Sequence, residues 1–325
     1  MRSARFSMAL AEGLVDLPAT GRIGVFRPRA GDDLTTFPAE RLVVLTGFRP
    51  DYDHFRSLGY ATETSGPLSA AIVCLPRSKA HAQALLAQAA AATSSGGPVI
   101  VDGQKTDGID ALLKLLKTRV ELSGPLAKAH GKIAAFPAGP ELADWAVPPR
   151  QIGGFVTCPG AFSADGPDRG SEFLAQALPA SLGPMVVDLG AGWGFLSRAI
   201  LERDGVERLD LVEAEAGALD CARLNIRDER ARFHWADACR FRPDRPVDAV
   251  VMNPPFHHGR TAEPELGLAF IRAARGMLAR EGALWMVANQ HLPYLPALSQ
   301  NFHSVEILGD DNVFRIVRAA KPRRG

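Results

Sequence analysis

Three alternating glycines and an acid follow an apolar run in the second half of the chain, where residues 186–194 read VVDLGAGWG. An apolar strand, a glycine turn and a helix let the backbone approach a nucleotide-like ligand at the carboxyl end of the strand. The dinucleotide fingerprint is G-x-G-x-x-G, but here the third glycine comes one residue earlier and an acid precedes the first. This spacing favours S-adenosylmethionine, whose methionine zwitterion needs a carboxylate and backbone groups and which has no pyrophosphate. A turn that serves packing alone is the alternative. The residues expected to bind are Asp188, Gly190, Ala191, Gly192 and Gly194.

Two further acids end the next two apolar runs. Glu213 closes the run LDLVE, where a carboxylate can accept hydrogen bonds from both ribose hydroxyls. Asp237, followed by Ala238, ends the next run, where it can accept from the adenine amino group. Each acid alone is more often a solvated loop residue, but acids at the ends of three successive strands predict one nucleoside site.

The fourth apolar run leads into the sequence NPPF, residues 253–256. The side-chain carbonyl of Asn253 and the backbone carbonyl of Pro254, held rigid by Pro254 and Pro255, can accept hydrogen bonds from a planar –NH₂ group. They would direct its lone pair toward a methyl donor. Phe256 would stack on the plane that carries the amine. The alternative, a proline-stiffened strand end with a core phenylalanine, leaves the asparagine unexplained.

His257 and His258 come next, but no third ligand accompanies them at a useful spacing. We therefore expect loop histidines and no metal. The cysteines are scattered without C-x-x-C spacing, which argues against a zinc site and a disulfide framework and predicts buried thiols. They are Cys74, Cys158, Cys221 and Cys239.

These residues need a sheet whose strands are joined by helices, and the second half of the chain alternates the two patterns. The last two strands are joined by too few residues for a parallel crossover and should form an antiparallel hairpin at the sheet edge. Expected strands are Met185–Leu189, Leu209–Glu213, Arg232–Asp237, Val247–Met252, Ala283–Ala288, Val305–Gly309 and Phe314–Ala319. Expected helices are Ser171–Leu178, Phe195–Arg203, Ala216–Asn225, Leu266–Leu278 and Tyr294–Gln300.

The first half shows the same rhythm and predicts a small parallel-sheet domain. Glycine, proline and polar residues between 138 and 170 mark a boundary, so we expect domains at 1–150 and 151–325. Expected strands are Arg22–Phe26, Arg41–Gly47, Ala70–Leu75, Pro98–Asp102 and Lys132–Phe136, with helices Tyr52–Leu58, Lys79–Ala92 and Ile109–Arg119.

Composition excludes several classes of protein. With 325 residues, 46% hydrophobic and 22% charged, the chain can bury a sizeable core and is neither disordered nor fibrous. A net charge of +1 provides no global attraction to nucleic acid or anionic lipid, so a polyanion must meet a local patch. No run reads as a membrane span or a secretory signal, and we expect a cytoplasmic monomer with no membrane partner.

Taken together, the motifs resemble class I S-adenosylmethionine-dependent methyltransferases that act on amino groups, and within them the bacterial ribosomal RNA guanine-N2 methyltransferase family. The resemblance covers residues 155–320. It rests on the segment PGAFSADG at 159–166, Asp168 with Gly170-Ser171, the glycine turn, NPPFH with Gly259, and VAN with LPY at 287–294.

The resemblance implies two tandem Rossmann-like domains. The second would be a catalytic, doubly wound seven-stranded sheet with an antiparallel last strand. The first would be degenerate and bind no cofactor, serving a structural or RNA-contacting role. It also implies that Phe162, Ser163 and Asp165 close over the cofactor, and that the partner is ribosomal RNA or a ribosomal subunit. Arginines such as Arg240, Arg315 and Arg318 are candidate phosphate contacts, although each is more often a solvated surface charge.

The acceptor stays open between several planar amines. DNA adenine and protein glutamine methyltransferases share the Asn-Pro-Pro-aromatic motif, and a large-subunit guanine is a further candidate. A nicotinamide-dependent oxidoreductase is disfavoured by the glycine spacing. A non-catalytic RNA-binding factor would keep the fold without binding cofactor.

Overall fold

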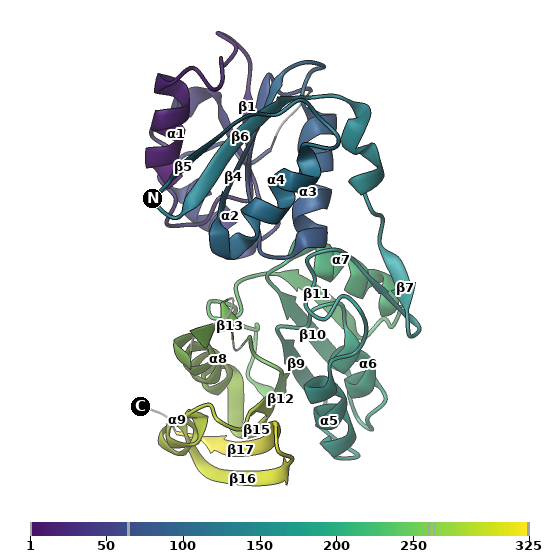
Figure 1. Cartoon of the computed structure of the whole chain (residues 1–325). Helices are drawn as coiled ribbons and strands as arrows, with labels where there is room; N and C mark the ends of the chain where they lie inside the picture. Colours follow the sequence, from purple (N-terminus) through teal and green to yellow (C-terminus); the bar gives the residue numbers. More distant parts are fainter. Residues whose placement is uncertain (1, 64–65, 256, 259–260, 263, 324–325) are drawn as a thin grey trace. The chain divides into compact units, whose positions relative to one another are not determined.

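The computed structural model describes residues 2–63, 66–255, 257–258, 261–262 and 264–323. The chain divides into two compact units, Met1–Pro148 and Pro149–Gly325. Each unit is built on a twisted sheet flanked by helices (Figure 1). In the described part of the chain, no helix combines the length and apolar character needed to cross a membrane.

The sheet of the first unit has the strand order β2-β1-β3-β4-β6-β5. Strands β1 to β4 are parallel, whereas β6 runs antiparallel to both of its neighbours. The predicted parallel sheet is therefore confirmed for β1 to β4 and wrong for β6, which was expected to be parallel as well. Ala129 and His130, both with positive φ, are the two residues that join β5 to β6, and so short a turn can join only antiparallel strands. The strands are β1 (Ile23–Phe26), β2 (Leu42–Leu45), β3 (Ala70–Cys74), β4 (Pro98–Gln104), β5 (Ser123–Lys128) and β6 (Gly131–Pro137).

Four α-helices and three 3-10 turns complete this unit. The sequence patterns predicted α2, α3 and α4 but neither α1 nor β5. The buried face of α1 carries Arg2 and Arg5 beside Phe6 and Ala9, so it shows no apolar stripe. The helices are α1 (Arg2–Ala11), α2 (Arg49–Ser57), α3 (Lys79–Ala92) and α4 (Ile109–Leu116), and the turns are η1 (Ala39–Arg41), η2 (Lys105–Asp107) and η3 (Pro140–Trp145).

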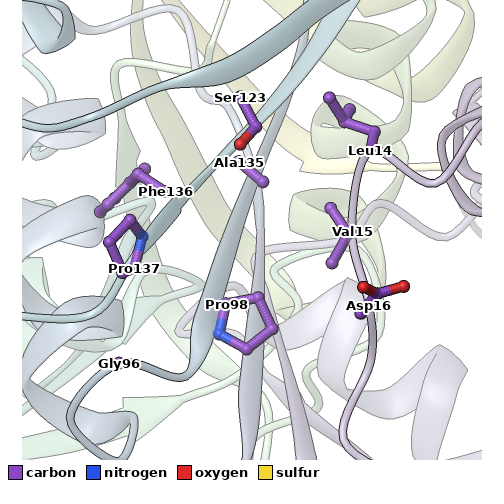
Figure 2. A pocket seen from close by; sticks show the side chains of 9 residues that line it. All are labelled: Leu14, Val15, Asp16, Gly96, Pro98, Ser123, Ala135, Phe136 and Pro137. Carbon is purple, nitrogen blue, oxygen red and sulfur yellow. The ribbon is translucent and has the colours of Figure 1, made fainter.

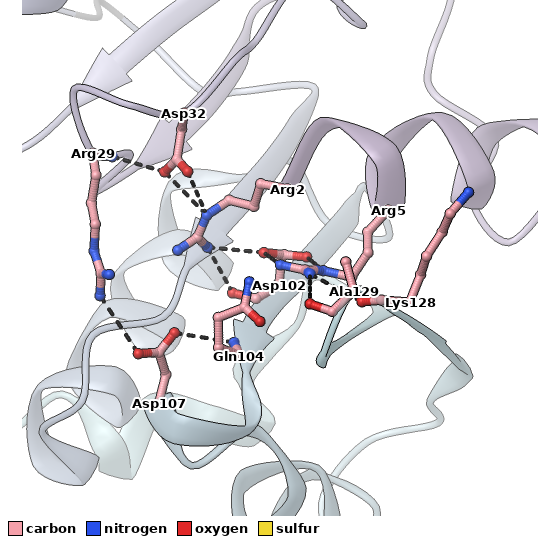
Figure 3. Close-up of polar contacts among 9 residues, drawn as sticks. All are labelled: Arg2, Arg5, Arg29, Asp32, Asp102, Gln104, Asp107, Lys128 and Ala129. Carbon is pink, nitrogen blue, oxygen red and sulfur yellow. Dashed lines mark hydrogen bonds and ion pairs between the residues drawn. The ribbon is translucent and has the colours of Figure 1, made fainter.

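The two arginines of α1 converge on Asp102, in β4 (Figure 3). Arg5 and Asp102 are both fully buried and form a two-pronged pair through both carboxylate oxygens. Arg2 adds a bond of 2.9 Å to the same carboxylate and pairs with Asp32 on its other side. This network fills the carboxyl end of the first sheet with protein side chains.

The second sheet has seven strands in the order β11-β10-β9-β12-β15-β17-β16. Only β17 opposes the direction of the others, because it pairs antiparallel with both β15 and β16. The predicted doubly wound sheet with an antiparallel strand near its end is confirmed. Its strands are β9 (Met185–Leu189), β10 (Arg208–Glu213), β11 (Ala231–Trp235), β12 (Val247–Met252), β15 (Leu278–Asn289), β16 (Phe302–Asp310) and β17 (Phe314–Pro322).

Helices lie on both faces of this sheet, and alternate residues of β9 pack into different apolar clusters, Val187 on one face and Val186 on the other. Two short hairpins, β7–β8 and β13–β14, lie outside the predicted elements. The helices are α5 (Arg169–Ala177), α6 (Phe195–Leu201), α7 (Ala216–Asn225), α8 (Pro264–Met277) and α9 (Tyr294–Asn301); the hairpin strands are β7 (Arg150–Ile152), β8 (Phe155–Thr157), β13 (His257–His258) and β14 (Thr261–Ala262).

The two sheets share one topology. The order β2-β1-β3-β4-β6-β5 repeats as β10-β9-β12-β15-β17-β16, with β11 added at one edge, and in each sheet the second-last strand of the order is the antiparallel one. Two tandem Rossmann-like folds are therefore confirmed. The correspondence places β1 at the position of β9 and β3 at the position of β12.

The buried ion network yields a stability prediction. Replacing Asp102 with alanine leaves two buried guanidinium groups without their carboxylate, and we expect the free energy of unfolding of the first unit to fall by about 3–5 kcal/mol. Trp145, the tryptophan of this unit, provides a fluorescence signal for urea unfolding.

The matched control is Asp144→Ala, which breaks the exposed ion pair with Arg119. A surface pair contributes little, so this variant should unfold close to the wild type. Equal destabilisation by the two variants would contradict the assigned role of Asp102.

Candidate active site

Three adjacent parallel strands bring the predicted residues to one edge of the second sheet. Strand β9 lies between β10 and β12, with Asp188 in register with Leu211 on one side and Val251 on the other. Asn253 follows β12 directly and Glu213 ends β10. The strands that follow β9 in the chain lie first on one side of it (β10 and β11) and then on the other (β12). At such a reversal of strand order, the carboxyl ends of the strands form the crevice in which open α/β sheets bind ligands.

Asp188 is completely buried, and only one of its two carboxylate oxygens has a hydrogen-bond partner. Its Oδ2 accepts a 2.6 Å hydrogen bond from the hydroxyl of Ser197 in α6, whereas its Oδ1 has no hydrogen-bond partner. Burial, with a smaller contribution from the Glu213 charge, raises the pKa of Asp188 from 3.8 to about 7. An unpaired buried carboxylate oxygen is costly, so it marks a position where a ligand donor would be stabilising.

The glycine turn after β9 depends on backbone conformations that only glycine adopts readily. Gly190, Gly192 and Gly194 have φ of 83°, 57° and 92°. A Cβ added at Gly194 would lie 3.2 Å from Ile226, whereas one added at Gly192 would point into open space. The turn is therefore packed at its helical end and open at its centre. Ala191, which lies between Gly190 and Gly192, is buried.

Glu213 holds the turn from the neighbouring strand. Its Oε2 accepts from the backbone N–H of Gly192 at 2.8 Å and its Oε1 from that of Glu215 at 2.7 Å. Burial raises the pKa of Glu213. Asp237 accepts from the N–H of Cys239 at 2.9 Å, and Ala238 between them is buried.

The amide of Asn253 is fixed at one end and open at the other. Its Nδ2 donates to Oδ2 of Asp168 at 2.9 Å and to the hydroxyl of Ser171 at 2.8 Å. Its Oδ1 is buried and has no partner. Pro254 is buried and Pro255 exposed, whereas Phe256 lies outside the described residues.

The segment predicted to close over the cofactor is anchored by its backbone. The carbonyl of Phe162 accepts from the indole N–H of Trp193 at 2.8 Å, which ties this segment to the glycine turn, while the Phe162 side chain is exposed. Ser163 has a positive φ and donates to the carbonyl of Gly166, and the exposed Asp165 pairs with Arg150. Closure over a cofactor stays a prediction.

Four side chains that shape the site were given no role from the sequence: Asp168, Ser171, Trp193 and Ser197. Only Asp168 carried a local signal, because an aspartate before a helical pattern is a typical N-cap. Trp193 and Ser171 contact residues 31 and 82 positions away, whereas Ser197 contacts Asp188 nine positions away across the glycine turn.

The backbone of His257 and His258 forms strand β13, and Gly259 lies outside the described residues. The described part of the chain contains no group of three or more metal-ligating side chains. The prediction of buried thiols is confirmed for Cys74 and Cys221, while Cys158 and Cys239 are partly exposed.

The arginines suggested for phosphate contact differ in their exposure and in the side chains that they contact. Arg240 is 80% exposed and 3.8 Å from Asp237. Arg315 pairs with Asp310 at 2.7 Å, and Arg318 lies over the ring of Trp285. Their contact with RNA stays a prediction.

The first unit lacks the corresponding groups. Its β1 is followed by Arg27-Pro28-Arg29 instead of a glycine turn, and its β3 by Leu75-Pro76-Arg77 instead of Asn-Pro-Pro. A cavity of about 150 Å³ lies elsewhere in this unit, near the start of β4 and the end of β6 (Figure 2). None of the predicted site residues lines it. The lining residues are Leu14, Val15, Asp16, Gly96, Pro98, Ser123, Ala135, Phe136 and Pro137.

Comparison with known proteins shows which sequences this chain resembles. The sequence profile of the family described as "Methyltransferase small domain" matches residues 153–318. The "Ribosomal RNA small subunit methyltransferase C" of Shewanella loihica is 27% identical and covers 88% of this chain and 90% of that protein. The protein of the same name from Alteromonas mediterranea is 28% identical over 76% of this chain and 72% of its own length.

A solved structure shares the fold of both units. The T. thermophilus 16S rRNA N2 methyltransferase RsmC, in complex with AdoMet and guanosine, superposes with a TM-score of 0.77. It is 23% identical and covers 94% of this chain and 90% of its own. This likeness shows the fold.

The raised pKa of Asp188 predicts a pH-dependent stability. Between about pH 4 and pH 7 the folded state holds a proton that the unfolded chain releases, so the free energy of unfolding should fall as pH rises through this window. The contribution of one such group is at most about 1.4 kcal/mol per pH unit.

Asp188→Asn should remove this contribution, because an amide keeps the shape and the bond from Ser197 but does not titrate. Urea unfolding followed by Trp193, Trp235 and Trp285 measures the second unit. A pH dependence identical in variant and wild type would show that Asp188 is ionised throughout.

Proposed function

Because the chain belongs to the methyltransferase small domain family, we propose that it transfers a methyl group from S-adenosylmethionine to the exocyclic N2 amine of a guanine in small-subunit ribosomal RNA. The observation that carries this proposal is the amide of Asn253, whose buried carbonyl oxygen has no partner at the end of β12. Similarity over 76–88% of the chain to proteins named ribosomal RNA small subunit methyltransferase C supports the RNA substrate.

The residues at the ends of β9 and β10 fit this cofactor. The unpaired Oδ1 of Asp188 and the open space above Gly192 are a carboxylate and a backbone surface for the methionine part. Glu213 would accept from the ribose and Asp237 from the adenine, beside Gly190, Ala191, Gly194 and Ala238. When bound, S-adenosylmethionine supplies a methyl group on a positively charged sulfur.

Asn253 and Pro254 would position the acceptor amine. Oδ1 of Asn253 and the carbonyl of Pro254 accept its two N–H groups, so that the nitrogen lone pair points away from both toward the methyl donor. Buried Pro254 keeps the second carbonyl rigid. Once methylated, the nitrogen carries positive charge and loses a proton readily, so these residues need only orient the amine and exclude water.

The remaining parts of the proposal concern the base and the first unit. Phe256 would stack on a guanine extruded from its RNA helix. Phe162, Ser163 and Asp165 would close over the cofactor. The first unit, without the glycine turn and with Leu75 in place of the asparagine, would be a degenerate domain with a structural or RNA-contacting role.

The direct test is methyl transfer from labelled S-adenosylmethionine to unmodified ribosomal RNA, to both ribosomal subunits and to duplex DNA, followed by nucleoside analysis. Label in N2-methylguanosine of small-subunit RNA would support the proposal. Label in large-subunit RNA, DNA adenine or protein glutamine would replace the acceptor. Absence of both methyl transfer and cofactor binding would point to a non-catalytic RNA-binding factor.

Asn253→Ala should reduce the transfer rate by at least about 100-fold, the usual effect of removing a group that acts on the reacting atoms. Cofactor affinity, measured by calorimetry, should stay nearly unchanged because the lost contact is to the acceptor. Asn301→Ala is a matched control, since the Asn301 side chain donates to the Ala297 carbonyl within α9, away from the predicted site residues. Comparable turnover by Asn253→Ala would refute the assignment.

A further inference from the structure

The amide of Asn253 meets the N-terminal end of a helix more than 80 residues earlier in the chain. Asp168 is the N-cap of α5, and its Oδ2 accepts from the backbone N–H of Ser171 at 2.9 Å. The same Oδ2 accepts from Nδ2 of Asn253, and the buried hydroxyl of Ser171 accepts from Nδ2 as well. Both hydrogens of the Asn253 amide are therefore used within the protein.

This arrangement fixes which end of the amide faces the site. In the opposite orientation, Oδ1 of Asn253 would lie at hydrogen-bond distance from the Asp168 carboxylate, two acceptors without a proton between them. Its –NH₂ group would then replace the unpaired Oδ1. Hydrogen bonds to a carboxylate are stronger than neutral ones, so the observed orientation is strongly favoured.

Gly170 makes this close approach possible. A Cβ at Gly170 would lie 3.0 Å from Oδ2 of Asp168 and 3.1 Å from the ring of Phe314 in β17. The Asp168 carboxylate is thus held between its own helix and Asn253, and a side chain at position 170 would require Asp168 or Phe314 to shift.

We propose that Asp168 and Ser171 are positioning residues, which hold the Asn253 amide so that its carbonyl oxygen faces the substrate and can accept a hydrogen bond from the amine that is methylated. Donation to a carboxylate also polarises the amide and strengthens Oδ1 as an acceptor. The inference rests on the proposed transfer to an amine, and it explains why the site takes an –NH₂ group rather than a group without a hydrogen to donate.

Kinetics of three variants test this role. Ser171→Ala keeps the cap, because the Ser171 backbone N–H still donates to Asp168, and removes one acceptor. We expect kcat to fall about threefold to tenfold with KM, cofactor affinity and Tm unchanged. Asp168→Gly keeps an acceptable N-cap and removes the carboxylate, and kcat should fall about 10-fold to 100-fold. Asp168→Asn, whose amide oxygen can replace Oδ2, should recover part of the loss.

Ser78→Ala is the matched control for loss of a cap. Ser78 accepts from the N–H of His81 at the start of α3 in the first unit. This variant should lower Tm slightly and leave kcat unchanged. If the rates of the Asp168 and Ser171 variants merely follow their folded fraction, or if Ser171→Ala has full activity, the positioning role is wrong.

A second readout does not depend on turnover. The chain has five asparagines, so selective ¹⁵N-asparagine labelling gives few side-chain NH₂ signals, and Asn253→Ala identifies the relevant pair. We expect Ser171→Ala and Asp168→Gly to shift this pair, whereas Ser78→Ala leaves it in place. A wild type that methylates no amine would overturn the proposed function, whereas an active wild type whose Asn253 signals ignore both variants would overturn this inference alone.

Discussion

The reversal of strand order at β9, where the chain changes from adding strands on one side of β9 to adding them on the other, is the constraint on which the candidate site depends. Because β10 and β12 pair with β9 on opposite sides, the ends of all three strands lie at one crevice. Parallel pairing then fixes the relative height of each strand end. A displacement of one strand by one residue would reverse every side chain on it, and the apolar residues packed on both faces of the sheet prevent that.

The two units deal with a buried aspartate in different ways. In the first unit Asp102 is paired with Arg5 and Arg2 of α1, so its charge is compensated within the protein. In the second unit Asp188 receives a single hydroxyl and its pKa rises. A fold that only has to be stable completes its polar contacts, whereas a fold that binds a ligand leaves one donor or acceptor unmet. The contrast therefore fits a structural role for α1 and a binding role for the end of β9.

The sequence predicted those features that are local or periodic. Strands β9 and β12 and helices α3 and α7 have the predicted bounds, because apolar alternation and capping residues are close together in the chain. Helix α1 was missed since two of the side chains on its buried face are arginines, and β5 since most of its residues are exposed. The direction of β6 was wrong because the Ala129-His130 turn contains none of the residues that usually mark a two-residue hairpin.

The hydrogen-bond partners of the predicted site residues were missed because they too depend on the assembled fold. Asp188, the glycines and Asn253 were identified by their place at strand ends, but their partners Ser197, Asp168 and Ser171 were not. Ser171 and Asn253 are 82 residues apart, and nothing in either segment indicates the other. Such contacts arise only when the sheet is assembled.

Two acceptors cannot by themselves choose a base. Oδ1 of Asn253 and the Pro254 carbonyl match any planar amine, whether it belongs to guanine, adenine or a glutamine side chain. Selection among these must come from groups that read the rest of the acceptor. At the corresponding strand end the first unit has Leu75-Pro76-Arg77. That unit keeps the topology of the second but has Leu75 where the second has Asn253, so its sheet has kept the fold without the chemistry. The shared strand order therefore does not by itself supply the polar groups of the candidate site, which depend on the residues that follow each strand.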